Sequence, residues 1–273
     1  MLGLTALIRT ICAIAAIITC HSPISAGEVL RIGGTGAANG LIKNVGAQFT
    51  AATGIEITLV PSLGTTGANR ALANGVIDLA VSGRPLHPAE IAKGLTVGAE
   101  VRTPFGLVTS HPRPEDFKSS EIARLYRSDN PTWADGTPIR IILRPTTDSD
   151  SWLLSHLFYG MSDAMTAIRK RSDLTVAATD QDNADMAEQV PGSLTGATLT
   201  QLQMENRNLR FVTIDGAAPS LENYRTGAYP FGKSLYFVLG AKKNSACERF
   251  LQFLRSPDGI AALHRAGVLM RLE

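Results

Sequence analysis

The first ninety residues repeat one local pattern: a short apolar strand leads into a loop rich in glycine, serine and threonine, and the loop opens a helix. The strands are EVLRI (28–32), IEITLV (55–60) and VIDLAV (76–81). GGTGAANG, PSLGTTG and SGRPLHP follow them. Repeated strand–loop–helix units are typical of a mostly parallel sheet covered by helices. The sequence therefore predicts an α/β fold.

Loops 33–40, 61–67 and 82–85 are expected at one edge of that sheet, because ligands of open α/β sheets bind outside the carboxyl ends of the strands. Backbone N–H groups at helix starts and hydroxyl donors suit an anion. The candidate ligand-binding residues in these loops are Thr35, Gly36, Ser62, Thr65, Thr66, Ser82 and Arg84.

A second strand–helix series lies between two segments predicted to cross between lobes. TPFGLVTSH (103–111) continues without a helix, and AYPFGKSLYFVL (228–239) is predicted to return to the first lobe. We expect the first lobe to comprise residues 27–105 and 231–273, and the second residues 106–230.

The expected elements of the second lobe are a helix near 119–128, a strand before Arg144, a helix from about 150 to 160, and strands at 174–178 and 209–214. Two helices near 245–254 and 257–266 are expected to complete the first lobe.

Residues 1–26 have the pattern of a secretory signal peptide, with one charge at Arg9, the apolar run ICAIAAIITC and then HSPISA. Cleavage is expected after Ala26, and export to the periplasm follows from it. An uncleaved anchor and lipidation at Cys20 are the alternatives. The mature chain then keeps only Cys247, which we expect to be a buried, inert thiol.

Composition excludes some classes of protein. The net charge of +2 gives no basic field for nucleic acid. Hydrophobic residues make up 44% and charged residues 18%, as in an ordinary globular chain. The histidines show no metal-ligand spacing, and there is no G-x-S-x-G segment. We therefore expect no enzyme, no metal and no cofactor.

The stretch RIILRPTTDSDSWLL (140–154) combines opposite signals. Arg144 follows an apolar strand and offers a guanidinium that matches an oxyanion. Ser149 adds a hydroxyl at a predicted helix start. Asp148 and Asp150, however, bring two carboxylates into the same loop. A micromolar site needs about 8 kcal/mol and a charged hydrogen bond contributes about 1.5–3 kcal/mol, so several loops must converge on the ligand.

Several segments resemble the phosphate-binding proteins of bacterial ABC importers. IEITLVPSLGTTGANRALANGVIDLAVSGRPL is similar to that family's strand, hydroxyl-rich loop and helix, followed by a D-[FLI]-[GA]-x-S-x-x-P-L segment. GGTGAANG lies where the family has its first phosphate loop. PGSLTGATLTQLQMENRNLRFVTIDGAAPS and YPFGKSLYFVL resemble two later family segments. The similarity covers nearly the whole mature chain.

The resemblance implies a periplasmic binding protein of type II, with two lobes and two hinge-crossing strands. It implies a monomer that binds a small oxyanion, phosphate or a similar anion, between the lobes and delivers it to an inner-membrane ABC permease. A different polar or zwitterionic solute, or a ligand-reporting sensor partner, is the alternative, and a secreted hydrolase is a weaker one.

The second-lobe loop departs from the family pattern R-x-D-G-S-G-T-x-F. Asp148-Ser149-Asp150 replaces the Ser-Gly-Thr that wraps phosphate, and Gly83-Arg84 stands where phosphate binders often carry an acid. Three hypotheses stay open. In the first, Asp148 or Asp150 accepts a ligand hydroxyl and Arg84 supplies a donor, so that the site still holds a protonated oxyanion. In the second, the acids repel dianions and the ligand is a zwitterion or another polar solute. In the third, Asp148 only caps the helix and orients Arg144.

Overall fold

The computed structural model describes residues 28–61, 63–242 and 244–271. The predicted signal peptide lies outside these residues. Within them, no helix combines the length and the apolar character needed to cross a membrane.

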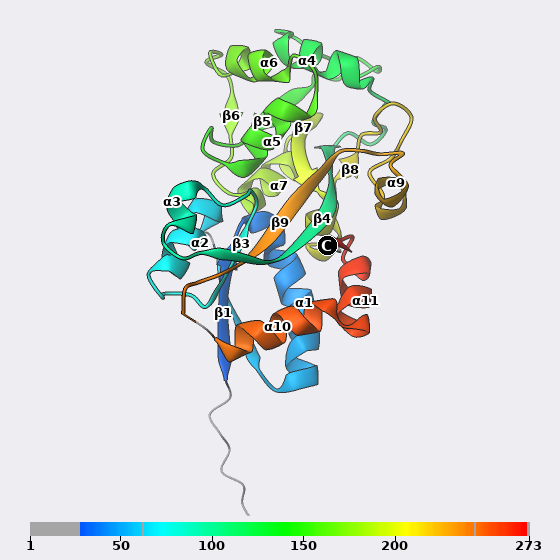
Figure 1. Cartoon of the computed structure of the whole chain (residues 1–273). Coiled ribbons are helices and arrows are strands. Elements are labelled where there is room, and N and C mark those ends of the chain that lie inside the picture. Colours follow the sequence, from blue (N-terminus) through cyan, green and yellow to red (C-terminus); the bar gives the residue numbers. More distant parts are fainter. Residues whose placement is uncertain (1–27, 62, 243, 272–273) are drawn as a thin grey trace, which may run out of the picture.

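The helices and strands form two lobes, one above the other in Figure 1. The elements of the lower, first lobe are β1 (Val29–Gly34), η1 (Gly36–Ala38), α1 (Asn39–Thr53), β2 (Glu56–Val60), α2 (Gly64–Ala73), β3 (Leu79–Ser82), α3 (Pro88–Ile91), α10 (Ser245–Arg255), α11 (Pro257–Arg265) and β10 (Leu269–Met270).

The elements of the upper, second lobe are α4 (Ser119–Arg127), β5 (Arg140–Leu143), α5 (Ser149–Leu157), α6 (Met161–Ile168), β6 (Thr175–Val176), α7 (Asp180–Gln189), β7 (Ser193–Thr198), β8 (Arg210–Phe211) and α9 (Leu221–Thr226). Two long strands join the lobes, β4 (Thr96–Thr109) and β9 (Gly232–Leu239).

Each lobe has its own hydrophobic core. Phe49, Phe237 and Phe250 are fully buried in the first lobe. Tyr126 and Trp133 are buried in the second. Separate cores are what a two-lobed type II binding protein requires, and the predicted fold class is confirmed in this respect. The lobe boundaries at 105/106 and 230/231 stay a prediction.

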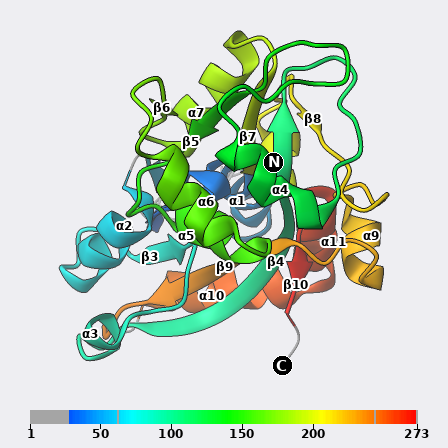
Figure 2. The same ribbon diagram turned by 90° about the horizontal axis from the view of Figure 1, so that it is seen from above.

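The strand β4 belongs to both lobes. Its first part pairs antiparallel with β9, and its last residues pair antiparallel with β7 and β8. Pro104 lies opposite Gly232, where both strands pass between the lobes. Figure 2 shows β4 as a long curved ribbon that runs past β9. These two strands are the predicted hinge-crossing strands.

The sheet is mixed, and the expectation of a mostly parallel sheet was wrong. Parallel pairing holds for β1 with β2 and β3, and for β5 with β6 and β7. The crossing strands pair antiparallel with their neighbours, because each runs back across an existing sheet. The parallel units therefore form two separate groups on either side of β4 and β9.

Several strands are shorter than the apolar runs that predicted them. The run 228–239 gives a strand only from Gly232, because Pro230 has no N–H to donate to a ladder. The runs 174–178 and 209–214 give the two-residue strands β6 and β8. The crossing strand β4, in contrast, begins at Thr96, before the predicted crossover at 103–111.

The helix α8 (Leu199–Met204) follows β7 and packs against α1 of the first lobe. Gly40 on α1 permits this contact, because a Cβ atom there would lie 2.7 Å from the Cβ of Met204. A segment inside the predicted boundaries of the second lobe thus reaches the first lobe and holds the two close to the hinge.

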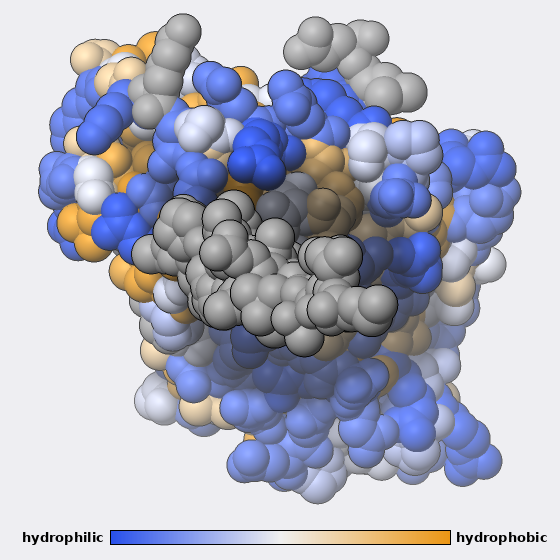
Figure 3. Space-filling model, turned by 90° about the horizontal axis from the view of Figure 1, so that it is seen from below, coloured by the Kyte–Doolittle hydropathy of each residue, from blue (hydrophilic) through white to orange (hydrophobic). Residues whose placement is uncertain are grey.

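Polar side chains cover much of the surface. On the face drawn in Figure 3, hydrophilic residues predominate and hydrophobic ones are scattered.

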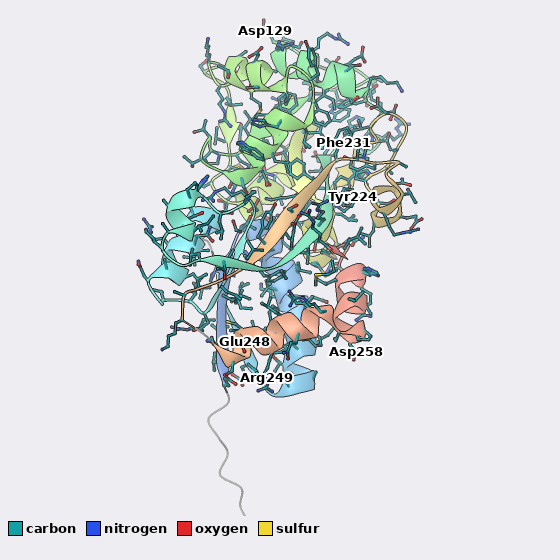
Figure 4. All side chains as sticks on the ribbon, viewed as in Figure 1. Asp129, Tyr224, Phe231, Glu248, Arg249 and Asp258 are labelled. Carbon is teal, nitrogen blue, oxygen red and sulfur yellow. The ribbon has the colours of Figure 1, made fainter. Side chains whose placement is uncertain are left out.

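Cys247 is buried, as predicted, and burial raises the pKa of its thiol to about 12. In Figure 4, Phe231 and Tyr224 lie near the start of β9, where the chain passes back toward the first lobe.

The fully buried hydroxyl of Tyr126 has no hydrogen-bond partner among the described residues. A buried polar group without a partner costs about 1–3 kcal/mol. Tyr126→Phe should therefore raise the free energy of unfolding by about 1 kcal/mol, measured by urea denaturation. Tyr229→Phe is the matched control, since the Tyr229 hydroxyl donates to the carbonyl of Phe105 at 3.0 Å and its loss should destabilise. A destabilised Tyr126→Phe would mean that the Tyr126 hydroxyl does have a hydrogen-bond partner.

Candidate functional site

The loops after β1, β2 and β3 lie together at one edge of the first-lobe sheet, as predicted. The N–H of Gly83 donates to the hydroxyl of Thr65 at 2.9 Å, which joins two of the loops. The N–H of Thr35 donates to the carbonyl of Val81 at 2.9 Å, which joins the third. This edge faces the second lobe, because Gly36 and Gly83 both lie against second-lobe side chains.

Arg144 directly follows β5 and is buried. Its Nη1 donates to the carbonyl of Ala177 at 2.7 Å, and its Nη2 donates to Asp148 at 2.8 Å. Its Nε has no hydrogen-bond partner among the described residues and lies 3.9 Å from an oxygen of Asp180. The Nε–H of Arg144, the arginine predicted to bind an anion, is therefore without an acceptor among the described residues, and the carboxylate of Asp180 is close to it.

Asp148 caps the helix that follows. Its side chain accepts the N–H of Asp150 at 2.8 Å while its other oxygen accepts from Arg144. This is the geometry of the third hypothesis, in which Asp148 is the N-cap of α5 and orients Arg144. Both of its oxygen atoms are used within the second lobe.

Asp180, the first residue of α7, reaches the start of the first helix of the other lobe. Its Oδ2 accepts the backbone N–H of Ala37 at 3.1 Å. Gly36 leaves space for this carboxylate, since a Cβ atom there would lie 2.6 Å from the same oxygen. Gln181 strengthens the junction by donating to the carbonyl of Gly36 at 3.0 Å. The position at the helix start where an oxyanion could bind is thus occupied by the carboxylate of Asp180.

Lys233, on the crossing strand β9, forms an ion pair with Asp150 at the start of α5. The two side chains are 1% and 5% exposed, so solvent does not screen the pair. Gly83 lies directly beside them: a Cβ atom there would come within 2.6 Å of the hydroxyl oxygen of Ser149 and 3.0 Å of Cε of Lys233. Here too the first lobe touches the second without an intervening gap.

These side chains form one group, which we call the interlobe cluster: Arg144, Asp148, Asp150, Asp180 and Lys233. Oxygen atoms of its three carboxylates lie within 4.8 Å of one another. Three acidic groups share two cations, so one negative charge is in excess when all are ionised. The pKa of Asp150 is raised to about 7: burial raises it most, the Lys233 ammonium lowers it, and the carboxylates of Asp180 and Asp148 raise it.

The carboxylates of the interlobe cluster are not a good metal site. Arg144 and Lys233 already neutralise two of them, and a bound cation would be repelled by both. What the cluster can do chemically is hold or exchange anionic oxygen atoms. The donors for this are the N–H of Ala37, Nε of Arg144 and the ammonium of Lys233.

Several predicted residues stay within the first lobe. Arg84 pairs with Glu90 at 2.8 Å, and its hydrogen bonds lower the pKa of Glu90 to about 2. Thr66 is exposed beside Arg84, and the Ser82 hydroxyl donates to the carbonyl of Arg84 at 2.6 Å. The part of the first hypothesis that makes Arg84 a donor across the lobes has no support in this geometry. Ser62 lies outside the described residues.

Two residues of the cluster were not among the predicted ligand contacts. Asp180 follows the 174–178 strand, so the rule that placed the first-lobe loops at a strand end could have identified it. Lys233 is a cation within an otherwise apolar strand pattern, where a buried position needs a charged partner. The ligand contacts themselves stay predictions.

The histidines do not join the cluster. His111 is buried, stacks on Trp133 with ring centroids 4.8 Å apart, and contacts Asp135 at 3.0 Å. His87 is the N-cap of α3. His156 stacks on Trp152 on the exposed side of α5. These positions fit the surface and packing roles expected from the sequence.

A family model described as PBP superfamily domain matches residues 21–258. No curated protein matches the chain.

The fold has many solved relatives. A Clostridium perfringens protein described as a phosphate ABC transporter substrate-binding protein, with phosphate bound, has a TM-score of 0.75 at 13% identity, covering 90% of this chain and 100% of that one. An ABC-type phosphate transport receptor from Vibrio cholerae has a TM-score of 0.61 at 12% identity, covering 89% and 100%. A periplasmic molybdate-binding protein from Azotobacter vinelandii has a TM-score of 0.59 at 14% identity, covering 89% of this chain and 99% of that one.

Removing the buried ammonium should be costly. Lys233→Met leaves three carboxylates, two of them buried, with one cation. Breaking one side of a buried ion pair typically costs about 3–5 kcal/mol. We expect a loss of this size in the free energy of unfolding, measured by urea denaturation at pH 8. Lys118→Met is the control, because Lys118 pairs with Asp116 at the surface and is 60% exposed. Equal stability of the two variants would contradict the buried pair.

The excess acid should make stability depend on pH. The pKa of Asp150 is about 7 in the folded protein, against about 4 in an unfolded chain. Between these values the folded state holds a proton that the unfolded chain has lost. Its stabilising effect is therefore complete below about pH 4 and is lost as the pH rises to about 7.

Urea denaturation from pH 5 to 8 should show a falling free energy of unfolding in the wild type and a flatter profile in Asp150→Asn. The exposed Asp163→Asn on α6 is the control and should follow the wild type. A wild-type curve that runs parallel to that of Asp150→Asn over this range would mean that Asp150 stays ionised throughout.

Proposed function

Since the chain belongs to the PBP superfamily, that of the periplasmic binding proteins, we propose that it is the substrate-binding component of a bacterial ABC importer and binds a small oxyanion between its lobes. The family membership and the two-lobed fold support a binding role over catalysis. The relatives with this fold include proteins described as binding phosphate and molybdate, which supports a tetrahedral oxyanion as the ligand class.

One observation carries the proposal: the junction of the lobes already holds an anionic oxygen. Asp180 places its carboxylate between the N–H of Ala37 and the guanidinium of Arg144, at 3.1 Å and 3.9 Å. Helix-start N–H groups and arginine are the donors that proteins use for oxyanions. The same donors, arriving from opposite lobes, fit a ligand that closes the lobes around itself.

The proposed contacts combine the N–H of Ala37 with several of the predicted residues. Thr35 and Gly36 contribute from the first lobe, and Arg144 and Ser149 from the second, with Asp148 orienting Arg144. Thr65, Thr66, Ser82 and Arg84 shape the first-lobe loops and support the contacts rather than making them.

The excess negative charge of the interlobe cluster restricts the ligand's own charge. A dianion placed beside three carboxylates meets strong repulsion in a site that excludes water. A monoanion that brings its own proton is favoured, because the proton can bridge an oxygen of the ligand and one of the cluster's carboxylates. We therefore propose a protonated or singly charged oxyanion.

A zwitterionic or other polar solute is the second candidate. The observation that favours it is the same excess carboxylate, which suits a ligand with an ammonium or several hydroxyl groups. Export to the periplasm and an inner-membrane permease partner belong to either version of the proposal. A sensor protein in place of the permease is compatible with both.

The test is calorimetric titration of residues 27–273, unfolded and refolded to remove carried ligand. Phosphate, molybdate and sulfate are titrated at two pH values, and glycine serves as a zwitterion. Micromolar binding of an oxyanion, stronger at the lower pH for phosphate, is expected. Binding of glycine alone would favour the second candidate, and no binding by a folded sample would reject the oxyanion proposal.

Arg144→Ala should abolish oxyanion binding, and Arg144→Lys should weaken it by about tenfold or more, since a charged hydrogen bond contributes about 1.5–3 kcal/mol. Calorimetry measures the dissociation constants, and thermal unfolding verifies that each variant is folded. Arg124→Ala, which removes an arginine that is 79% exposed in the same lobe, is the control. Arg84→Ala should also bind normally. An unchanged dissociation constant in Arg144→Ala would refute the proposed site.

A further inference from the structure

The position of Asp180 suggests how the site selects its ligand. The residue belongs to the second lobe, but its side chain ends at the helix start of the first. It is 4% exposed, so its carboxylate is removed from water. The neighbouring Arg144 is 6% exposed and keeps an unpartnered Nε within the described residues, 3.9 Å from that carboxylate.

These contacts are those of a bound anion. The carboxylate accepts from Ala37 at 3.1 Å, and Gly36 provides the space that it fills. A free oxyanion and this carboxylate cannot use the same N–H group together. We propose that Asp180 is a specificity-determining residue, an internal carboxylate that occupies the oxyanion subsite of the closed lobes and that a ligand must displace. This inference rests on the proposed function, the binding of a small oxyanion between the lobes.

The consequence for ligand choice follows from effective concentration. A group attached to the protein competes as if present at about millimolar or higher concentration. A free monocarboxylate offers the same two oxygens as Asp180 and gains nothing by exchange. A tetrahedral oxyanion has further oxygens, which can also accept from Ser149 or Lys233. Asp180 should therefore exclude carboxylates and admit tetrahedral oxyanions.

Charge adds to this selection. When a ligand displaces Asp180, the carboxylate must move away from Ala37 and Arg144, and the remaining cluster still contains Asp148, Asp150 and Lys233 on the facing elements α5 and β9. A ligand that carries a proton can share it with one of these acids. A carboxylate that is ionised at neutral pH cannot.

Asp180→Ala tests the inference, because it empties the subsite. Formate and acetate are the probes, together with inorganic phosphate and molybdate, and calorimetry measures each dissociation constant. We expect the variant to bind formate, which the wild type does not, and to bind the tetrahedral oxyanions at least about tenfold more tightly. Asp180→Asn keeps the shape of the side chain without its charge, and its dissociation constants should lie between those of the wild type and of Asp180→Ala. It also tests the inference if Asp180→Ala folds poorly.

The matched control is Asp185→Asn. It removes a carboxylate from the same helix, but Asp185 is 53% exposed and pairs with Arg207 away from the cluster. It should bind as the wild type does. Small-angle X-ray scattering adds a second readout: ligand-free Asp180→Ala should have a larger radius of gyration than the wild type, and formate should restore the smaller value.

The outcomes separate this inference from the proposed function. If the wild type binds an oxyanion and Asp180→Ala binds it no more tightly, the function stands and the inference falls. If only the variants bind, Asp180 occupies the subsite as inferred and the native ligand is not a simple oxyanion. If neither binds any probe and both are folded, the inference and the function both fall.

Discussion

The burial of charge at the junction of the lobes constrains the rest of this structure. Arg144, Asp150, Asp180 and Lys233 are all at least nine-tenths buried, and an ion withdrawn from water costs several kcal/mol unless a partner of opposite charge compensates it. Their partners come from different segments: the start of α5, the start of α7 and the strand β9. The contacts of Arg144 with Asp148 and Asp180 lie within the second lobe, whereas the Lys233–Asp150 pair joins this lobe to the crossing strand β9 and the Asp180–Ala37 hydrogen bond joins it to the first lobe. Electrostatics as well as shape therefore favours the joined arrangement of the lobes.

Much of the fold could be predicted from local patterns. The strand–loop–helix units placed three loops at one sheet edge, and the apolar segments near 103–111 and 228–239 marked the crossings of β4 and β9. The sheet direction could not be predicted in the same way. Parallel pairing is a property of neighbouring units, whereas the crossing strands pair with whatever sheet they return to, and that depends on tertiary topology.

The site was harder to predict because each charged side chain has several potential partners in space. Arg84 sits in a ligand-like segment, but Glu90 six residues later captures it. The loop that contains Asp148 had been open to three interpretations, and the contact of Asp148 with Arg144 fits the third of them. Asp180 was not among the residues predicted for the site. Only the approach of the other lobe gives it a second neighbour, Ala37.

Gly36 and Gly83 lie on the first lobe, directly against side chains that reach them from the second lobe. Each leaves less than a methyl group's width to its neighbour, Asp180 in one case and Ser149 in the other. A single carbon atom added at either position would push the lobes apart. Gly83 is not one of the proposed ligand contacts, so for the proposed binding protein a substitution there would change how long a solute is retained without altering any residue that recognises it.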